Sequence, residues 1–196
     1  MKLVVLRVVV VGVMFLLAAP AAAQPAGPKE RGFAFEAQLG TRFYAADYGD
    51  GPSMPLTAVD GGFFAGYKVG RFQVGASIDF TRYSVELNGH TVASSLLTIM
   101  PGFRAAILRS GDERVEFFGQ VDFGYGHDFR SGPTAGEDHN RIVYQIGPGI
   151  RLWFHPNFAV GALVGLRGEF DIQQGEDGAT IGWTSVFARL TLTGVF

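Results

Sequence analysis

Hydrophobic and polar side chains alternate one by one along most of this chain, from Gly32 to Phe196. Successive side chains of a β-strand point to opposite faces, so this alternation predicts strands with one apolar and one polar face. The stretch 32–44 shows the pattern clearly. Its first face carries Phe33, Phe35, Ala37, Leu39, Thr41 and Phe43, and its second face carries Glu36, Gln38, Gly40 and Arg42.

Eight segments follow this pattern, and each is long enough for a tilted strand to cross a bilayer, which takes about 9 to 11 residues. The segments are 32–44, 58–68, 71–83, 92–107, 114–128, 141–154, 158–172 and 181–196. Short connections (69–70, 108–113 and 155–157) alternate with longer ones (45–57, 84–91, 129–140 and 173–180). Short turns on one side and longer loops on the other are typical of outer-membrane barrels. We therefore predict an all-β fold, an eight-stranded antiparallel up-and-down transmembrane β-barrel.

Charged residues stay on one face of each segment, and the opposite face is free of charge within the expected membrane depth. A soluble lipocalin-like barrel would show the reverse polarity, with an apolar interior. An Arg or Lys facing lipid at the midplane costs about 2 to 4 kcal/mol, so the uncharged face is predicted to contact lipid.

The predicted interior holds seven acidic and six basic residues in near balance. An eight-stranded barrel is just wide enough for side chains to fill, so these charges should pair and plug the interior. Glu116 is the expected partner of both Arg104 and Arg151, and acids should outnumber bases in the half near the longer loops. The predicted network is Glu36, Arg42, Asp60, Lys68, Asp79, Arg104, Glu116, Asp122, Arg151, Arg167, Glu169, Asp171 and Arg189.

Two prolines, Pro101 and Pro148, fall inside predicted strands. Proline has no backbone N–H and removes a hydrogen bond from the strand ladder. A closed barrel has no free edge that tolerates this loss, so each proline is predicted to mark a β-bulge.

The N-terminal residues 1–23 read as a secretory signal peptide, with basic Lys2 and Arg7, an apolar run and small residues before a cleavage point after Ala23. A permanent membrane helix is the alternative, but Arg7 interrupts its apolar stretch. Residues 24–31 form a short periplasmic lead-in, and residues 32–196 form the barrel domain. The chain has no cysteine, so no disulfide is expected.

Composition and motifs limit the classes of function that fit this chain. Without the signal, 14 basic residues face 18 acidic ones, which argues against a nucleic-acid partner. Glu137, Asp138 and His139 with His127 and Asp128 form a candidate metal site in the third long loop, although solvated loop polarity is the simpler interpretation. No catalytic residue and no cofactor is predicted, because no nucleophile or nucleotide-binding motif is found and Phe129, not Ser, stands two residues after His127.

The last residues, LTLTGVF, end on an aromatic residue behind alternating apolar positions. Leu190, Leu192 and Phe196 resemble the assembly signal of Gram-negative outer-membrane barrels. With its architecture, the chain resembles the small barrel group typified by the transmembrane part of OmpA and by OmpX. The resemblance implies a monomer integral to the cell outer membrane, with membrane lipids and the barrel-assembly machinery as partners and a structural or surface-interaction role through loops 45–57 and 129–140. A narrow porin-like channel, an OmpW-like lateral route and a lipid A-modifying enzyme are the alternatives.

Overall fold

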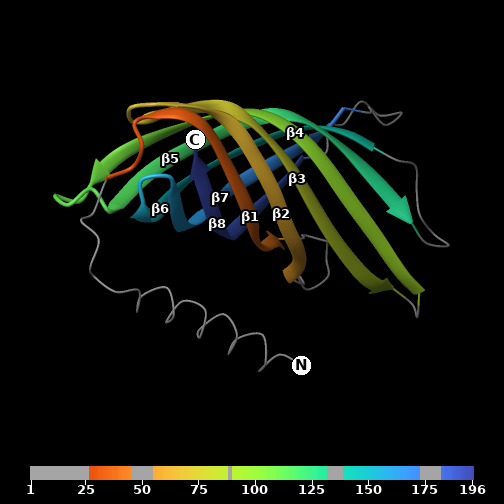
Figure 1. Ribbon diagram of the computed structural model, residues 1–196. Coiled ribbons are helices and arrows are strands. Elements are labelled where there is room, and N and C mark those ends of the chain that lie inside the picture. Colours follow the sequence, from red (N-terminus) through yellow and green to blue (C-terminus); the bar gives the residue numbers. More distant parts are fainter. Residues whose placement is uncertain (1–26, 46–54, 88–89, 132–138, 173–181) are drawn as a thin grey trace, which may run out of the picture.

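The computed structural model describes residues 27–45, 55–87, 90–131, 139–172 and 182–196. Eight antiparallel strands form one closed barrel in which each strand pairs with its sequence neighbours and β8 pairs with β1 (Figure 1). Within the described ranges, no helix is long and apolar enough to cross a membrane. The strands are β1 (Arg31–Ala45), β2 (Pro55–Val69), β3 (Phe72–Leu87), β4 (His90–Arg109), β5 (Val115–Ser131), β6 (His139–His155), β7 (Phe158–Asp171) and β8 (Gly182–Val195).

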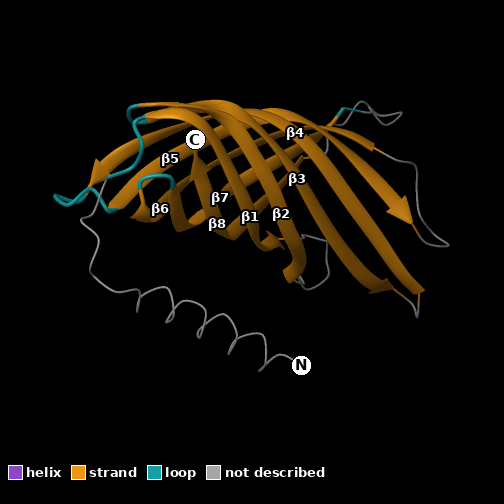
Figure 2. Cartoon of the chain, in the orientation of Figure 1, coloured by secondary structure: helices purple, strands orange, loops and turns teal. Residues whose placement is uncertain are grey.

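Three short connections lie together at one end of the barrel, here called the short-turn end (Figure 2, left). They join β2 to β3, β4 to β5 and β6 to β7, as the sequence predicts. In the β4–β5 turn, the Ser110 hydroxyl and the Arg114 backbone N–H donate hydrogen bonds to the Asp112 carboxylate. These bonds, that from Ser110 first, lower the pKa of Asp112. The next residue, Glu113, has a positive φ of 57°, which closes the turn.

The eight predicted strands are confirmed, but one predicted connection is wrong. Residues 84–91 were expected to form a longer loop, whereas β3 and β4 stay paired as far as Leu87 and His90. Cross-strand hydrogen bonds continue along two adjacent strands until a turn interrupts them. The alternation itself also continues here, because Val85 and Leu87 alternate with Ser84 and Glu86.

The predicted bulges at Pro101 and Pro148 are also wrong. Pairing is interrupted in the β4–β5 ladder at Pro101 and in the β6–β7 ladder at Pro148, but the register is the same on both sides of each gap. Each proline therefore costs hydrogen bonds without inserting an extra residue. The register shifts instead near Ile107 and Phe154, close to the short turns.

The outer wall is apolar, as predicted from the alternation. Its side chains are large, hydrophobic and exposed on all eight strands; examples are Phe35, Phe63, Ile78, Ile99, Val121, Ile146, Val164 and Leu190. Charged residues of the same strands, among them Asp60, Asp79, Arg104 and Arg167, are buried on the inner face. The barrel is therefore apolar outside and charged inside.

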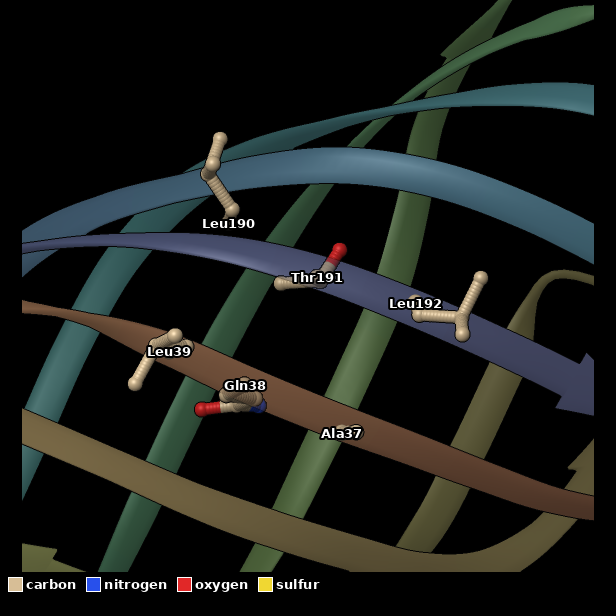
Figure 3. Close-up of a pocket in the computed structure, with 6 residues that line it drawn as sticks. All are labelled: Ala37, Gln38, Leu39, Leu190, Thr191 and Leu192. Carbon is tan, nitrogen blue, oxygen red and sulfur yellow. The ribbon is translucent and has the colours of Figure 1, made fainter. Parts of the chain in front are cut away.

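The seam between β1 and β8 closes the barrel and includes Phe196. The Phe33 and Phe196 backbones exchange two hydrogen bonds of 2.9 and 2.8 Å, and the Phe196 ring packs at 5.6 Å from Phe158 and 6.4 Å from Phe35. Farther along the seam, the small side chain of Ala37 leaves a shallow hollow of about 240 Å³ on the outer wall. Leu39, Leu190 and Leu192 stand around this seam hollow (Figure 3).

Candidate functional site

The interior of the barrel is the candidate site, because it gathers charged and polar side chains from all eight strands and buries them. Alternation dictates this placement, since every second residue of a barrel strand points inward. Most of the charged side chains among them form two clusters of ion pairs, one toward each end of the barrel.

The upper cluster lies on the side away from the short turns. Its hub is the Glu169 carboxylate, which lies 2.7 Å from Arg42, 2.7 Å from Arg141 and 3.1 Å from Arg167. Two other carboxylates are each shared by two arginines, so that the cluster closes into a ring. Four arginines thus face four acids. The members are Arg42, Asp60, Asp79, Asp128, Arg141, Arg167, Glu169 and Arg189.

The lower cluster lies toward the short-turn end. The Glu36 carboxylate lies 2.8 Å from both Arg104 and Arg151, and Arg151 also lies 3.2 Å from Glu116. Thr193 donates a further hydrogen bond of 2.7 Å to Glu36. Three arginines and three acids balance here too. The members are Glu30, Glu36, Arg104, Arg109, Glu116 and Arg151.

One glutamine connects the two clusters. Arg189 donates to the Gln38 Oε1 atom at 2.6 Å, and Gln38 Nε2 donates to Glu36 at 2.8 Å. A continuous chain of hydrogen bonds therefore extends from the upper to the lower cluster. Such networks hold their members strongly when each charge is compensated in the low dielectric of the interior.

Three predicted members lie outside the clusters. Asp122 accepts hydrogen bonds from Gln120 and Gln145, and no cationic side chain of the described residues lies within 4 Å of it. Lys68 donates to the Lys29 carbonyl oxygen at 2.7 Å, and its ammonium nitrogen lies 5.5 Å from the centre of the Trp153 ring. The last, Asp171, lies 2.7 Å from His139 at the upper rim.

One detail of the predicted network is wrong. The ion-pair partner of Arg104 is Glu36 across the barrel, not Glu116. The upper cluster itself is balanced, because Arg141 and Arg189 join it, and two of the acids expected in that half, Asp122 and Asp171, lie outside the cluster. Arg141, at the start of its predicted strand, is absent from the predicted network although it has the same parity as the inward Gln145.

A set of inward aromatic rings, absent from the predicted network, lies between glycines and arginines. The guanidinium carbon of Arg151 lies 4.0 Å from the centre of the Phe118 ring, which covers Gly149 on the neighbouring strand. Arg104 lies 3.8 Å from the centre of the Phe64 ring in the same way. Cation–π attraction and the covering of glycine by aromatic rings stabilise such stacks. The members of the three stacks are Gly75, Phe64 and Arg104; Gly149, Phe118 and Arg151; and Gly165, Phe187 and Arg189.

These stacks leave no room at their glycines. A Cβ atom at Gly149 would lie 2.3 Å from Phe118 Cζ, so Gly149→Ala should lower the free energy of unfolding. Overpacking of this kind costs about 1–3 kcal/mol. The control is Gly119→Ala on the outer wall, where the new Cβ would lie at an ordinary 3.5 Å from Ile107 Cδ1 and stability should change by less than about 0.5 kcal/mol. Urea unfolding of both variants in vesicles measures the difference, and equal stabilities would contradict the packing described.

The segment just before β1 crosses the short-turn end and touches all three short turns. The Lys29 N–H donates to Pro156 O at 2.7 Å, and the Gly70 N–H donates to Glu30 O at 2.6 Å. Arg109, the last residue of β4 before the β4–β5 turn, donates to the Glu30 carboxylate at 2.7 Å. This part of the predicted lead-in therefore lies across the mouth of the barrel, and Glu30 joins it to the lower cluster.

The candidate metal site is not assembled from the residues that can be placed. His127 Nδ1 lies 2.8 Å from Asn140 Oδ1, whereas His139 pairs with Asp171. Glu137 and Asp138 lie outside the described residues. In the described part of the chain, no group of three or more His, Asp or Glu side chains is arranged to hold a metal ion.

Comparison with known proteins supports an assignment of the fold. No protein-family model matches the sequence, and neither does any curated protein. Among solved structures, Neisserial surface protein A (NspA) superposes with a TM-score of 0.57 at 15% identity, over 84% of this chain and 97% of that chain. The chain has the fold of the small eight-stranded outer-membrane barrels.

Two further structures are similar at lower scores. The N-terminal β-barrel domain of Pseudomonas aeruginosa OprF gives a TM-score of 0.49 at 13% identity, over 87% of this chain and all of that domain. The attachment invasion locus protein Ail of Yersinia pestis gives 0.47 at 17% identity, over 84% of this chain and 97% of that chain. NspA alone of these three supports the fold assignment, and at 15% identity it supports the fold only.

Proposed function

We propose that this protein is an integral β-barrel of the outer membrane with a structural or surface-interaction role, and that its interior is closed by a salt-bridged plug. The observation that carries the proposal is the reversed polarity of the barrel, which is apolar on its outer wall and charged in its interior. Such a wall is suited to lipid, because lipid cannot solvate a charge.

The height of the outer wall fits a membrane. Arg71, just before β3, and Arg82, on β3, are exposed arginines eleven residues apart, and the outward side chains between them are all apolar. Eleven residues at about 3.3 Å each, tilted by about 45°, span about 26 Å. This height agrees with the apolar band of about 25 Å in outer-membrane barrels. Each arginine would then lie at the level of lipid headgroups, with Arg71 on the periplasmic side.

The interior clusters support a plug rather than a channel. Members of both clusters, such as Arg42, Asp60, Arg104 and Glu169, have almost no exposed surface. Aromatic rings fill space between them, and the segment before β1 crosses the periplasmic mouth. An ion entering this interior would have to break several ion pairs at once.

A closed interior leaves the outer surfaces to carry the function. The candidate partner segments 45–57 and 129–140 lie largely outside the described residues, and the strand ends that flank them lie at the end away from the short turns, which would be the cell exterior. NspA is named as a surface protein, and a comparable surface role through these connections is proposed for this chain.

A charge placed on the outer wall tests membrane insertion. Val164 is exposed near the middle of β7, so Val164→Arg should lower the free energy of unfolding in lipid vesicles by about 2–4 kcal/mol. Ile172 is exposed just beyond the end of β7, and Ile172→Arg should cost only about 0–1 kcal/mol. Reversible unfolding followed by tryptophan fluorescence measures both. Equal and small effects would show that this wall does not face lipid.

A further inference from the structure

The outer wall carries a second hollow over β4, β5 and β6, larger than the seam hollow, with a volume of about 370 Å³. It lies within the size range of about 300–1,000 Å³ that is usual for ligand pockets. Small or flat residues form its floor because Ala105, Gly119 and Pro148 pair side by side across three strands. The wall above the floor is the next row of residues, Phe103, Val121 and Ile146.

The hollow begins at the short-turn end. Ile107, at the β4 register shift, lines it on that side and lies over Gly119. The Ala106 N–H, one residue away, donates to the Arg71 carbonyl oxygen at 2.8 Å. The hollow therefore runs up the wall from the level of Arg71.

Arg71 is a cation that the rest of the described chain does not neutralise. Its side chain is exposed, and it makes neither an ion pair nor a side-chain hydrogen bond with any residue that the structure describes. The neighbouring Phe72 stacks on Phe103 at 5.7 Å between ring centres, which links the arginine to the wall of the hollow. By contrast, Arg31 at the same end donates to the Tyr67 hydroxyl at 3.1 Å.

We propose that this hollow and Arg71 form a binding site for one glycerophospholipid of the periplasmic leaflet. The acyl chain lies over Ala105, Gly119 and Pro148, and the phosphate accepts hydrogen bonds from Arg71. Arginine is suited to this role, because its planar guanidinium matches the geometry of a phosphate. The site rests on the proposed function, since only a membrane-inserted wall meets lipid.

Photocrosslinking in vesicles of phosphatidylethanolamine and phosphatidylglycerol tests the site. A benzophenone amino acid replaces Phe103 in the hollow or, as the matched control, Phe63 on β2; the two phenylalanines are 43% and 45% exposed. Mass spectrometry then measures the phospholipid adduct at each position. We expect about tenfold more adduct at 103, the ratio that corresponds to about 1.4 kcal/mol.

Two variants separate the acyl site from the phosphate site. Gly119→Leu fills the hollow and should abolish the excess of adduct at 103, whereas Ala37→Leu fills the seam hollow and should leave it unchanged. With the crosslinker at position 103, Arg71→Gln should lower the phospholipid adduct to the level that diacylglycerol gives. Diacylglycerol has no phosphate for Arg71 to bind. The Arg71→Gln comparison tests the proposed site even if Gly119→Leu does not fold.

Failure of the lipid site and failure of the proposed function give different results in this experiment. Equal adducts at 103 and 63, insensitive to Arg71→Gln, would overturn the lipid site while leaving the membrane barrel intact. Absence of adduct at both positions, with protein that does not float with the vesicles, would overturn the proposed function itself.

Discussion

Glu169→Gln should lower the free energy of unfolding by about 3–5 kcal/mol, the cost of leaving buried charges without their partner. Three arginines share this carboxylate, and the variant keeps its size while removing its charge. Water entering the interior would make this loss of unfolding free energy smaller. Chemical unfolding in vesicles, followed by tryptophan fluorescence, gives the value.

Asp122→Asn is the matched control for that experiment. Asp122 is equally buried, but its hydrogen bonds come from the neutral side chains of Gln120 and Gln145. The asparagine keeps one oxygen that accepts these bonds, so we expect a change of less than about 1 kcal/mol. If the two variants were equally destabilised, the stability would depend on interior packing and not on the ion pairs.

Removal of Phe196 should strongly reduce the amount of folded protein in the outer membrane. The deletion loses two backbone hydrogen bonds to Phe33 and the ring contacts with Phe35 and Phe158. It thereby leaves the last rung of the closing β1–β8 ladder unpaired, and unpaired backbone groups are costly in a membrane. Heat-modifiable migration of the membrane fraction on gels measures the folded yield.

A comparison of Phe196→Ser with Phe154→Ser distinguishes the role of the terminal residue in barrel closure from a general loss of exposed aromatic side chains. Both phenylalanines are 54% exposed near the short-turn end, but Phe154 is not at the β1–β8 seam. The Phe196 variant should have the lower yield by several fold. A similar yield for both would remove the special role assigned to the terminal residue.

Most of the fold could be predicted because period-two alternation is a local property. Charges on only one face set the polarity of the barrel, and turn residues set the short connections. The errors arise where the structure depends on a neighbouring strand. Pro101 and Pro148 interrupt ladders without shifting register, because the flanking hydrogen bonds keep the strands aligned. The sequence of one strand does not contain that information.

The interior was only partly predictable for the same reason. Parity places Glu36, Arg104 and Arg151 inward, but which of them pair depends on how strands distant in sequence face each other across the barrel. The charge pattern alone does not reveal the inward rings of Phe64 and Phe118, which share the parity of the charged residues. An aromatic residue on the charged face of a strand, with a glycine on the adjacent strand, is the signal that would have revealed the stacks.

Planar-bilayer conductance of the refolded protein tests the closed interior most directly. We expect the wild-type barrel to insert without resolved openings, because ion pairs of both clusters fill its interior. Discrete, ion-selective openings of the stable wild-type protein would contradict the plug and identify the interior as a channel.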